Sequence, residues 1–139
     1  MPKSGPIILV EDDPDDQELI AEIIQESRFE NPLKIFHNGK QAFDYLRTSS
    51  EYPFLILCDV NMPVMNGLEL RQLMFDDESL RNRSAPFIFL STTEDREVVR
   101  RAYRLSVQGF FKKPSEFGEL RKLLELALDY WKHCEYPGK

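Results

Sequence analysis

The sequence predicts an α/β protein built on a doubly wound, five-stranded parallel sheet with helices on both faces. Short apolar runs alternate with longer segments whose apolar residues follow the helical period. This strand–helix unit occurs five times, which is typical of a parallel sheet covered on both faces. Right-handed crossovers between parallel strands then leave few topologies.

The first half of the chain contains three of these units. PIILV at 6–10 is predicted as a strand, and the segment 15–27 as a helix. That helix places four aliphatic residues on one face: Leu19, Ile20, Ile23 and Ile24. The elements that follow are a strand at 33–38, a helix at 39–47, a strand at 54–58 and a helix at 67–75.

The second half completes the pattern with a strand at 86–90, a helix at 95–105, a short strand at 108–112 and a long helix at 116–134. The polar stretches TSSEYP and DDESLRNRSAP are predicted as surface loops. There is no internal repeat, low-complexity tract or linker, so residues 1–139 are predicted as a single domain without an output domain.

Composition restricts the function classes. The chain has 42% hydrophobic and 30% charged residues, as globular proteins do, and its net charge of −6 argues against direct nucleic-acid binding. No apolar run has membrane-spanning length, and MPKSGPIILV lacks a signal-peptide core. Cys58 and Cys134 provide neither a disulfide framework nor zinc-ligand spacing, and Cys58 is read as a small buried hydrophobe. A cytoplasmic protein without membrane contact is expected.

Polar side chains follow four of the predicted strands at their carboxyl ends, where open α/β sheets bind ligands. In a flavodoxin-like strand order, 2-1-3-4-5, these four ends are neighbours. The residues in question are Glu11, Asp12, Asp13, Asp59, Ser91, Thr92, Lys112 and Lys113.

Such a cluster has a definite chemistry. Carboxylates repel by about 4 kcal/mol per pair at about 4 Å and an effective dielectric near 20, so a cation is expected among them. Carboxylate oxygens favour Mg²⁺, Mn²⁺ or Ca²⁺ over zinc. With a lysine and a hydroxyl, the set predicts phosphoryl transfer to Asp59, which forms an acyl phosphate. Lys113 and Mg²⁺ neutralise the transferred group, and Ser91 hydrogen-bonds one of its oxygens.

Each motif also has a simpler interpretation. EDDPDD is a favourable N-terminus for the first helix, with Asp13 or Asp15 as its cap. Ser91 and Thr92 are candidate helix caps before EDREVV, and Lys113 before Pro114 is a candidate solvated loop lysine. The occurrence of all these groups at four strand ends favours the phosphoryl-transfer interpretation.

In these motifs the chain resembles the receiver domain (CheY-like) of two-component response regulators over nearly its whole length. ILVEDD, DVNMP with MNG, FLST and FFKKP carry the resemblance. It implies that Asp59 is the phosphorylated residue, that Ser91 and Lys113 assist, and that Pro114 follows a cis peptide bond. It further implies the metal-site residues Glu11, Asp12, Asp59 and, through its backbone carbonyl, Asn61.

The resemblance also implies Mg²⁺ as cofactor, with Mn²⁺ as a substitute, and a sensor histidine kinase and a downstream protein as partners. The domain is then a phosphoacceptor with self-catalysed phosphotransfer and slow autodephosphorylation, not an enzyme. Ser91 and Phe110 map to the switch positions of the family. For Phe110 plain core packing remains the alternative, and Ser115 is a candidate cap of the last helix.

The last helix carries two apolar stripes. The first contains Phe117, Leu120, Leu124, Ala127, Leu128 and Trp131, and the second Leu123, Leu126, Tyr130 and Cys134. Two interpretations stay open: a wide core-facing helix, or a partner or homodimer surface formed by the fourth helix, fifth strand and last helix. The long helix with its late tryptophan is similar to receivers that partner phytochrome-type histidine kinases.

Three rival functions are less well supported. A haloacid-dehalogenase-like phosphatase needs a second aspartate two residues after the first, and Asn61 stands there. In a flavodoxin-like FMN carrier, EDDPDD would repel the phosphate. A binding module that is never phosphorylated would not need the carboxylate, hydroxyl and lysine together.

Overall fold

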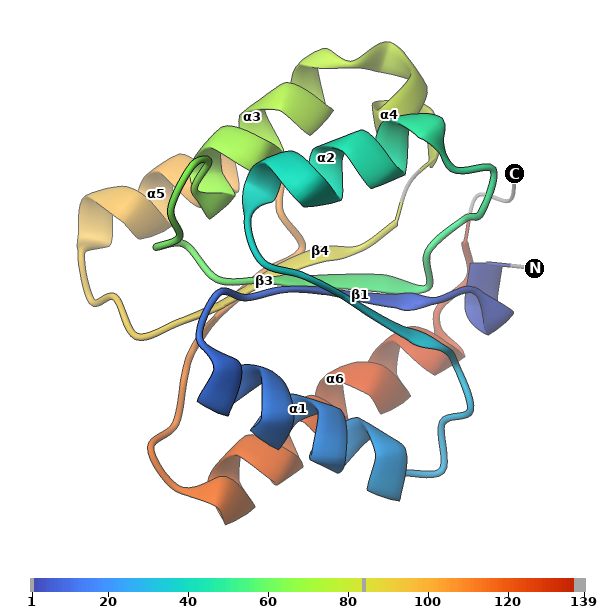
Figure 1. Ribbon diagram of the computed structural model, residues 1–139, viewed down its shortest axis with the longest axis vertical. Helices are drawn as coiled ribbons and strands as arrows, with labels where there is room; N and C mark the ends of the chain where they lie inside the picture. The colour runs from blue at the N-terminus through green and yellow to red at the C-terminus, as the bar shows by residue number, and fades with distance from the viewer. Residues whose placement is uncertain (1, 84, 137–139) are drawn as a thin grey trace.

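The computed structural model describes residues 2–83 and 85–136, and these form three layers with a parallel sheet in the middle (Figure 1). The strand order is β2-β1-β3-β4-β5, and every neighbouring pair is parallel. This confirms the predicted fold class and the predicted order. The strands are β1 (Ile7–Val10), β2 (Leu33–Phe36), β3 (Leu55–Cys58), β4 (Phe87–Ser91) and β5 (Gly109–Lys112).

The helices fall on the two faces of the sheet as the alternation predicts (Figure 1). One face carries α1 (Pro14–Glu26) and α6 (Phe117–His133). The other carries α2 (Gly39–Thr48), α3 (Gly67–Asp76), α4 (Glu78–Arg83) and α5 (Arg96–Arg104). A short 3₁₀ turn, Pro2–Ser4, precedes β1.

The helix α4 lies where the sequence predicts a loop, and that expectation is wrong. The Asp77 carboxylate accepts a hydrogen bond from the Leu80 amide at 3.2 Å, and Leu80 is buried in the core. A capping bond and one anchoring side chain therefore support a helix too short to show a hydrophobic period in the sequence.

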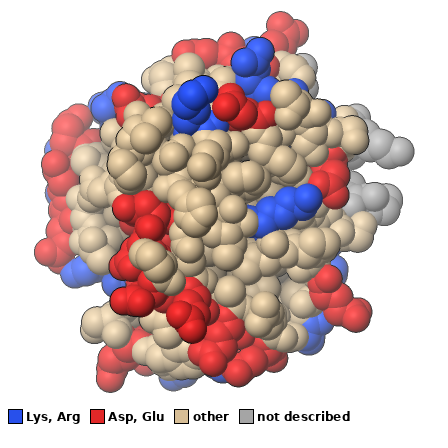
Figure 2. All heavy atoms as spheres, viewed as in Figure 1, with Lys and Arg blue, Asp and Glu red and all other residues tan. Residues whose placement is uncertain are grey.

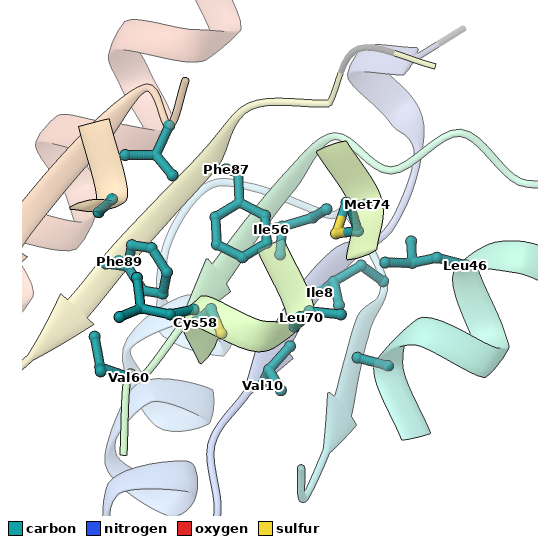
Figure 3. Packing of buried hydrophobic residues seen from close by; sticks show 14 of the residues in the cluster. Ile8, Val10, Leu46, Ile56, Cys58, Val60, Leu70, Met74, Phe87 and Phe89 are labelled. Atoms are coloured by element: carbon teal, nitrogen blue, oxygen red, sulfur yellow. The ribbon is translucent and has the colours of Figure 1, made fainter. Parts of the chain in front are cut away.

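Strand residues alternate between two cores. Ile8, Val10, Ile56 and Cys58 point to the side of α2, α3 and α5, as Figure 3 shows, whereas Ile7 and Leu9 point to α1 and α6. Burying one aliphatic or aromatic side chain contributes about 1.5–3 kcal/mol, so the two cores hold the sheet firmly. Ile20, Ile23 and Ile24 of α1 are buried in the core, as predicted. Leu19, which was predicted on the same face of the helix, is 37% exposed.

The register of the sheet decides where the strand ends emerge. Val10 pairs with Cys58, so Glu11 and Asp59 leave their strands side by side. The ladder continues past both ends, because the Asp59 amide donates to the Val10 carbonyl at 3.0 Å. Ser91 pairs with Lys112, and the Lys113 amide donates to the Ser91 carbonyl at 2.8 Å. Backbone hydrogen bonding thus gathers these residues at one edge.

Within residues 2–83 and 85–136, none of the helices combines the length and the apolar character that crossing a bilayer requires.

Candidate functional site

Three carboxylates from two neighbouring strand ends meet at this edge. Glu11, Asp12 and Asp59 each offer an oxygen, and these atoms lie within 4.8 Å of one another. Glu11 is buried and Asp12 is exposed, so the cluster opens to solvent on one side. Figure 2 shows acidic side chains as a band over this edge and along α1. The surrounding negative potential favours a cation here.

Lys113 provides a positive charge inside the cluster. Its ammonium lies 2.9 Å from Glu11 Oε1, 2.7 Å from Asp16 Oδ2 and 3.7 Å from Asp59 Oδ2. The Lys113 side chain is only 8% exposed, so its interpretation as a solvated loop lysine is wrong. Burial by itself would lower the pKa of Lys113, but the hydrogen bonds to Asp16 and Glu11 and the nearby carboxylate charges raise it above its ordinary value. The group is therefore a permanent cation.

Glu11 is the carboxylate most affected by its surroundings. Burial raises the pKa of Glu11 to about 7, the Asp59 charge adds to this rise, and the bond from Lys113 opposes it. Glu11 Oε2 also accepts a weak bond from the Asp13 amide at 3.2 Å. A buried carboxylate with one cation among several anions is short of positive charge. A divalent cation with hard oxygen ligands fits this set of donors.

The segment after β3 holds Asp59 in one orientation. The Val60 amide donates to Asp59 Oδ1 at 2.7 Å, which leaves Oδ2 on the side of Lys113. The chain then turns back until the Gly67 amide donates to the Val60 carbonyl at 2.8 Å. A Cβ at Gly67 would lie 2.2 Å from the Asp59 carbonyl oxygen, so only glycine fits.

Two further features fix this turn. Val64 has a φ of 67°, a left-handed backbone conformation that is strained for a β-branched residue. Asn66 and Glu69 form a reciprocal capping box that starts α3. The sequence NMPVMNG therefore lets the chain reverse tightly around the Asp59 carboxylate before the helix begins.

Ser91 and Phe110 lie on neighbouring strands beside the cluster. Ser91 is fully buried, and its hydroxyl accepts a long bond of 3.3 Å from the Thr93 amide. Its interpretation as a helix cap is wrong, because Asp95 caps α5 by accepting from the Glu97 amide at 3.0 Å. Phe110 is half-buried and packs on Phe89 with ring centroids 5.5 Å apart. The switching roles of Ser91 and Phe110 stay predictions.

Of the two other predicted helix caps, Asp13 is confirmed and Ser115 is wrong. Asp13 caps α1, because its carboxylate accepts from the Asp15 amide at 3.0 Å. Ser115 does not cap α6: Glu116 occupies the cap position, and its side chain makes no capping bond to the described residues. Asn61 is exposed just after the turn begins, and the metal-binding role of its carbonyl stays a prediction.

The expectation of a cis bond before Pro114 is wrong. The Lys113–Pro114 bond is trans, since the described residues contain no cis peptide bond. An X–Pro amide prefers the trans form by only about 0.5–1 kcal/mol, so the residue pair alone does not determine the isomer.

Sequence reasoning missed Asp16, which makes the shortest contact of the Lys113 ammonium, 2.7 Å. Asp16 is the third residue of α1, and a side chain at that position reaches back toward the cap. With Asp13 as the cap and Pro14 at the first helical position, this spacing was the available signal. Gln17 was missed as well: its amide donates to the Glu11 carbonyl and contacts His37 Nδ1 at 2.9 Å.

The family comparison agrees with this geometry. The sequence model of the family 'response regulator receiver domain' matches residues 7–125 of this chain. The chain belongs to the response regulator receiver family. Receiver domains are signalling domains that histidine kinases phosphorylate and that bind a divalent metal.

Among the relatives of this receiver is FilR2 of Methanothrix harundinacea, a probable methanogenesis regulatory protein. It is 30% identical over 129 residues, which cover 90% of this chain and 82% of the relative. Response regulator Rcp1 of Synechocystis is 28% identical over 130 residues, covering 90% of this chain and 87% of Rcp1.

Solved structures are similar over almost the whole receiver. The phosphorylated cyanobacterial phytochrome response regulator RcpA has a TM-score of 0.86 at 28% identity, covering 96% of this chain and 98% of RcpA. The Mn²⁺-bound form of Rcp1 has a TM-score of 0.84 at 27% identity, covering 96% of this chain and 99% of that chain.

Proposed function

We propose that this receiver accepts a phosphoryl group from a sensor histidine kinase on Asp59, in a Mg²⁺-dependent reaction, and signals through protein–protein contacts. One observation carries the proposal. Asp59 shares its edge of the sheet with the carboxylates of Glu11 and Asp12, whose oxygens lie within 4.8 Å of one another and of Asp59, and with a buried lysine whose ammonium lies 3.7 Å from Asp59 Oδ2. This combination serves phosphoryl transfer better than any structural purpose, because it concentrates charge that would otherwise destabilise the fold.

The reaction follows from these positions. A carboxylate oxygen of Asp59 attacks the phosphorus of a phosphohistidine, and an acyl phosphate forms. The P–N bond breaks, and its electron pair stays on the imidazole nitrogen, which then takes up a proton. The Val60 amide fixes the Asp59 carboxylate through Oδ1. In this proposal Lys113 neutralises one phosphoryl oxygen and the Ser91 hydroxyl donates to another.

The metal ligands we propose are the carboxylates of Glu11, Asp12 and Asp59 with the backbone carbonyl of Asn61. Oxygen donors of this kind suit Mg²⁺, and Mn²⁺ accepts the same set. The Mn²⁺-bound structure of Rcp1 supports the binding of a divalent metal by a receiver of this kind. A bound divalent cation offsets the negative charge that the phosphoryl oxygens carry in the transition state.

The acyl phosphate serves as a signal and is not a catalytic intermediate in this proposal. A phosphatase of the haloacid dehalogenase type uses an acidic residue two positions after its nucleophile, and Asn61 occupies that position. Without this general acid–base, hydrolysis is expected to be slow. The likeness to RcpA and Rcp1 supports a kinase of the phytochrome type as the phosphoryl donor.

The output surface we propose consists of α5, β5 and α6. A hollow of about 530 Å³ opens there, lined by Tyr103, Phe110, Leu126 and Tyr130 among others. Tyr103, Leu126 and Tyr130 are 52%, 66% and 61% exposed, which is unusual for large apolar side chains and typical of contact surfaces. Phe110 joins this hollow to Phe89 in the core, so a change at β4 would reach the surface.

This surface offers its apolar residues to a downstream protein or to a second copy of the chain. The charges on α5 are engaged partly within the helix itself. Glu97 pairs with Arg100 and Arg104 of its own helix at 3.4 and 3.1 Å, so a salt-bridged dimer seam would have to break these pairs. The first apolar stripe of α6 packs in the core, with the partly buried Trp131 against it, and only Phe117 of that stripe is substantially exposed, at 37%.

The phosphoacceptor assignment is tested by intact-mass measurement after incubation with acetyl phosphate and Mg²⁺. Wild type is expected to gain one phosphoryl group and Asp59→Asn none. Asp15→Asn is the matched control, because it removes an exposed carboxylate from the same region. Equal incorporation in wild type and Asp59→Asn would remove Asp59 from its role.

A further inference from the structure

Lys113 contacts more carboxylates than its proposed reaction uses. A lysine ammonium has three N–H donors, and here it has hydrogen-bond distances of 2.7 Å to Asp16 and 2.9 Å to Glu11. The distance to Asp59 Oδ2 is 3.7 Å, too long for a direct hydrogen bond. Asp59, the proposed phosphoacceptor, is therefore the most distant of the three carboxylates around the Lys113 ammonium.

Asp16 differs from the other carboxylates of the site. It is not among the group whose oxygens lie within 4.8 Å of one another, which contains Glu11, Asp12 and Asp59. It contacts Lys113 from the first turn of α1, where the helix dipole favours a negative side chain. Its side chain is 26% exposed, and that of Lys113 8%, so solvent screens the pair only weakly.

We infer that Asp16 is a positioning residue that holds Lys113 away from Asp59 until a phosphoryl group arrives. The inference rests on the proposed function, because it concerns the same lysine. A phosphoryl oxygen on Asp59 and the Asp16 carboxylate compete for the same ammonium. Asp16 thereby lowers the affinity of the site for phosphoryl groups and sets how completely Lys113 engages the modified aspartate.

The competition can be measured with beryllofluoride, which mimics a phosphoryl group on an aspartate, titrated at saturating Mg²⁺ and followed by ¹⁹F NMR. Asp16→Asn removes the competing charge with little change in shape. Its beryllofluoride binding is expected to be about 10-fold tighter than wild type, equivalent to about 1.4 kcal/mol. Asp15→Asn removes the same charge from the neighbouring, exposed residue and is expected to change binding less than about twofold, as exposed charges do.

A double-mutant cycle shows whether the effect passes through Lys113. In a Lys113→Ala background, Asp16→Asn is expected to lose its effect on beryllofluoride binding. Without beryllofluoride, the ¹H–¹⁵N signal of the Lys113 ammonium is expected to shift in Asp16→Asn and to stay in place in Asp15→Asn. Asp16→Ser, which also removes the carboxylate and suits a first helical turn, serves as a second variant.

The outcomes separate this inference from the function on which it rests. If wild type does not bind beryllofluoride, both fall. Wild-type binding with unchanged or weaker binding in Asp16→Asn and Asp16→Ser would overturn the inference alone. The inference would also be overturned if Asp16→Asn still tightened beryllofluoride binding in the Lys113→Ala background, because the effect would then come from the overall charge of the site.

Discussion

Adding one methyl group at Gly67 tests how tightly the chain is closed around Asp59. A Cβ there would lie 2.2 Å from the Asp59 carbonyl oxygen and 2.7 Å from the Phe89 ring, while ordinary contact begins at 3.4 Å. The first of these neighbours is backbone at the end of a buried strand, so it cannot rotate away. Overpacking of this kind costs about 1–3 kcal/mol, and occasionally more.

The same substitution at Gly118 should act in the opposite direction. A Cβ at Gly118 meets no heavy atom within 4 Å, and the residue is the second of α6. Alanine in a helix is favoured over glycine by about 0.5–1 kcal/mol. Gly67→Ala and Gly118→Ala are therefore identical chemical changes with expected effects of opposite sign.

Thermal unfolding followed by circular dichroism measures both. At about 3 °C per kcal/mol for a chain of this size, Gly67→Ala should lower the midpoint by about 3–9 °C, and Gly118→Ala should raise it by at most about 1.5–3 °C. A Gly67→Ala protein as stable as wild type would refute the close approach of the turn to Asp59. Equal shifts in both variants would mean that glycine content, and not geometry, decides.

Three other perturbations test separate parts of the structure. Asp12→Ala should weaken Mg²⁺ binding by about 10-fold or more in calorimetry, since it removes one of the few carboxylate ligands that Mg²⁺ uses; unchanged affinity would contradict the ligand assignment. Leu124→Ala, at a fully buried site of α6, should cost about 2–5 kcal/mol in urea unfolding. Leu126→Ala, at a site 66% exposed, should cost less than about 0.5 kcal/mol, and similar values for the two leucines would contradict the burial pattern. Burial raises the pKa of the Cys58 thiol well above its ordinary value, so iodoacetamide at pH 8 should alkylate Cys134 and leave Cys58 intact in the folded protein; mass spectrometry showing the reverse would disprove it.

The gathering of Asp12, Asp59 and Lys113 could be predicted from the sequence because it depends on the backbone. Parallel strands present their carboxyl ends at one edge, and the alternation of apolar and helical segments indicates parallel strands. Once the strand order is known, the residues that follow neighbouring strands must lie close together, because the backbone alone sets their positions.

Other features depend on distances that local sequence does not contain. The helix α4 exists because Leu80 finds a place in the core, and its own segment has no hydrophobic period to show this. The isomer of the bond before Pro114 depends on the surrounding fold, because the intrinsic energy difference between the cis and trans forms is small.

The layered α/β fold, the edge that carries the site and its chemical groups are all predictable from local sequence, because the hydrophobic period and the order of strands and helices are local properties. Which of these groups touch depends on how the whole domain packs. Lys113 and Asp16 lie 97 residues apart in the chain, and their 2.7 Å contact joins the segment after β5 to the first turn of α1. Partner choice among several carboxylates is a matter of a few ångströms, and packing of the whole domain sets those distances.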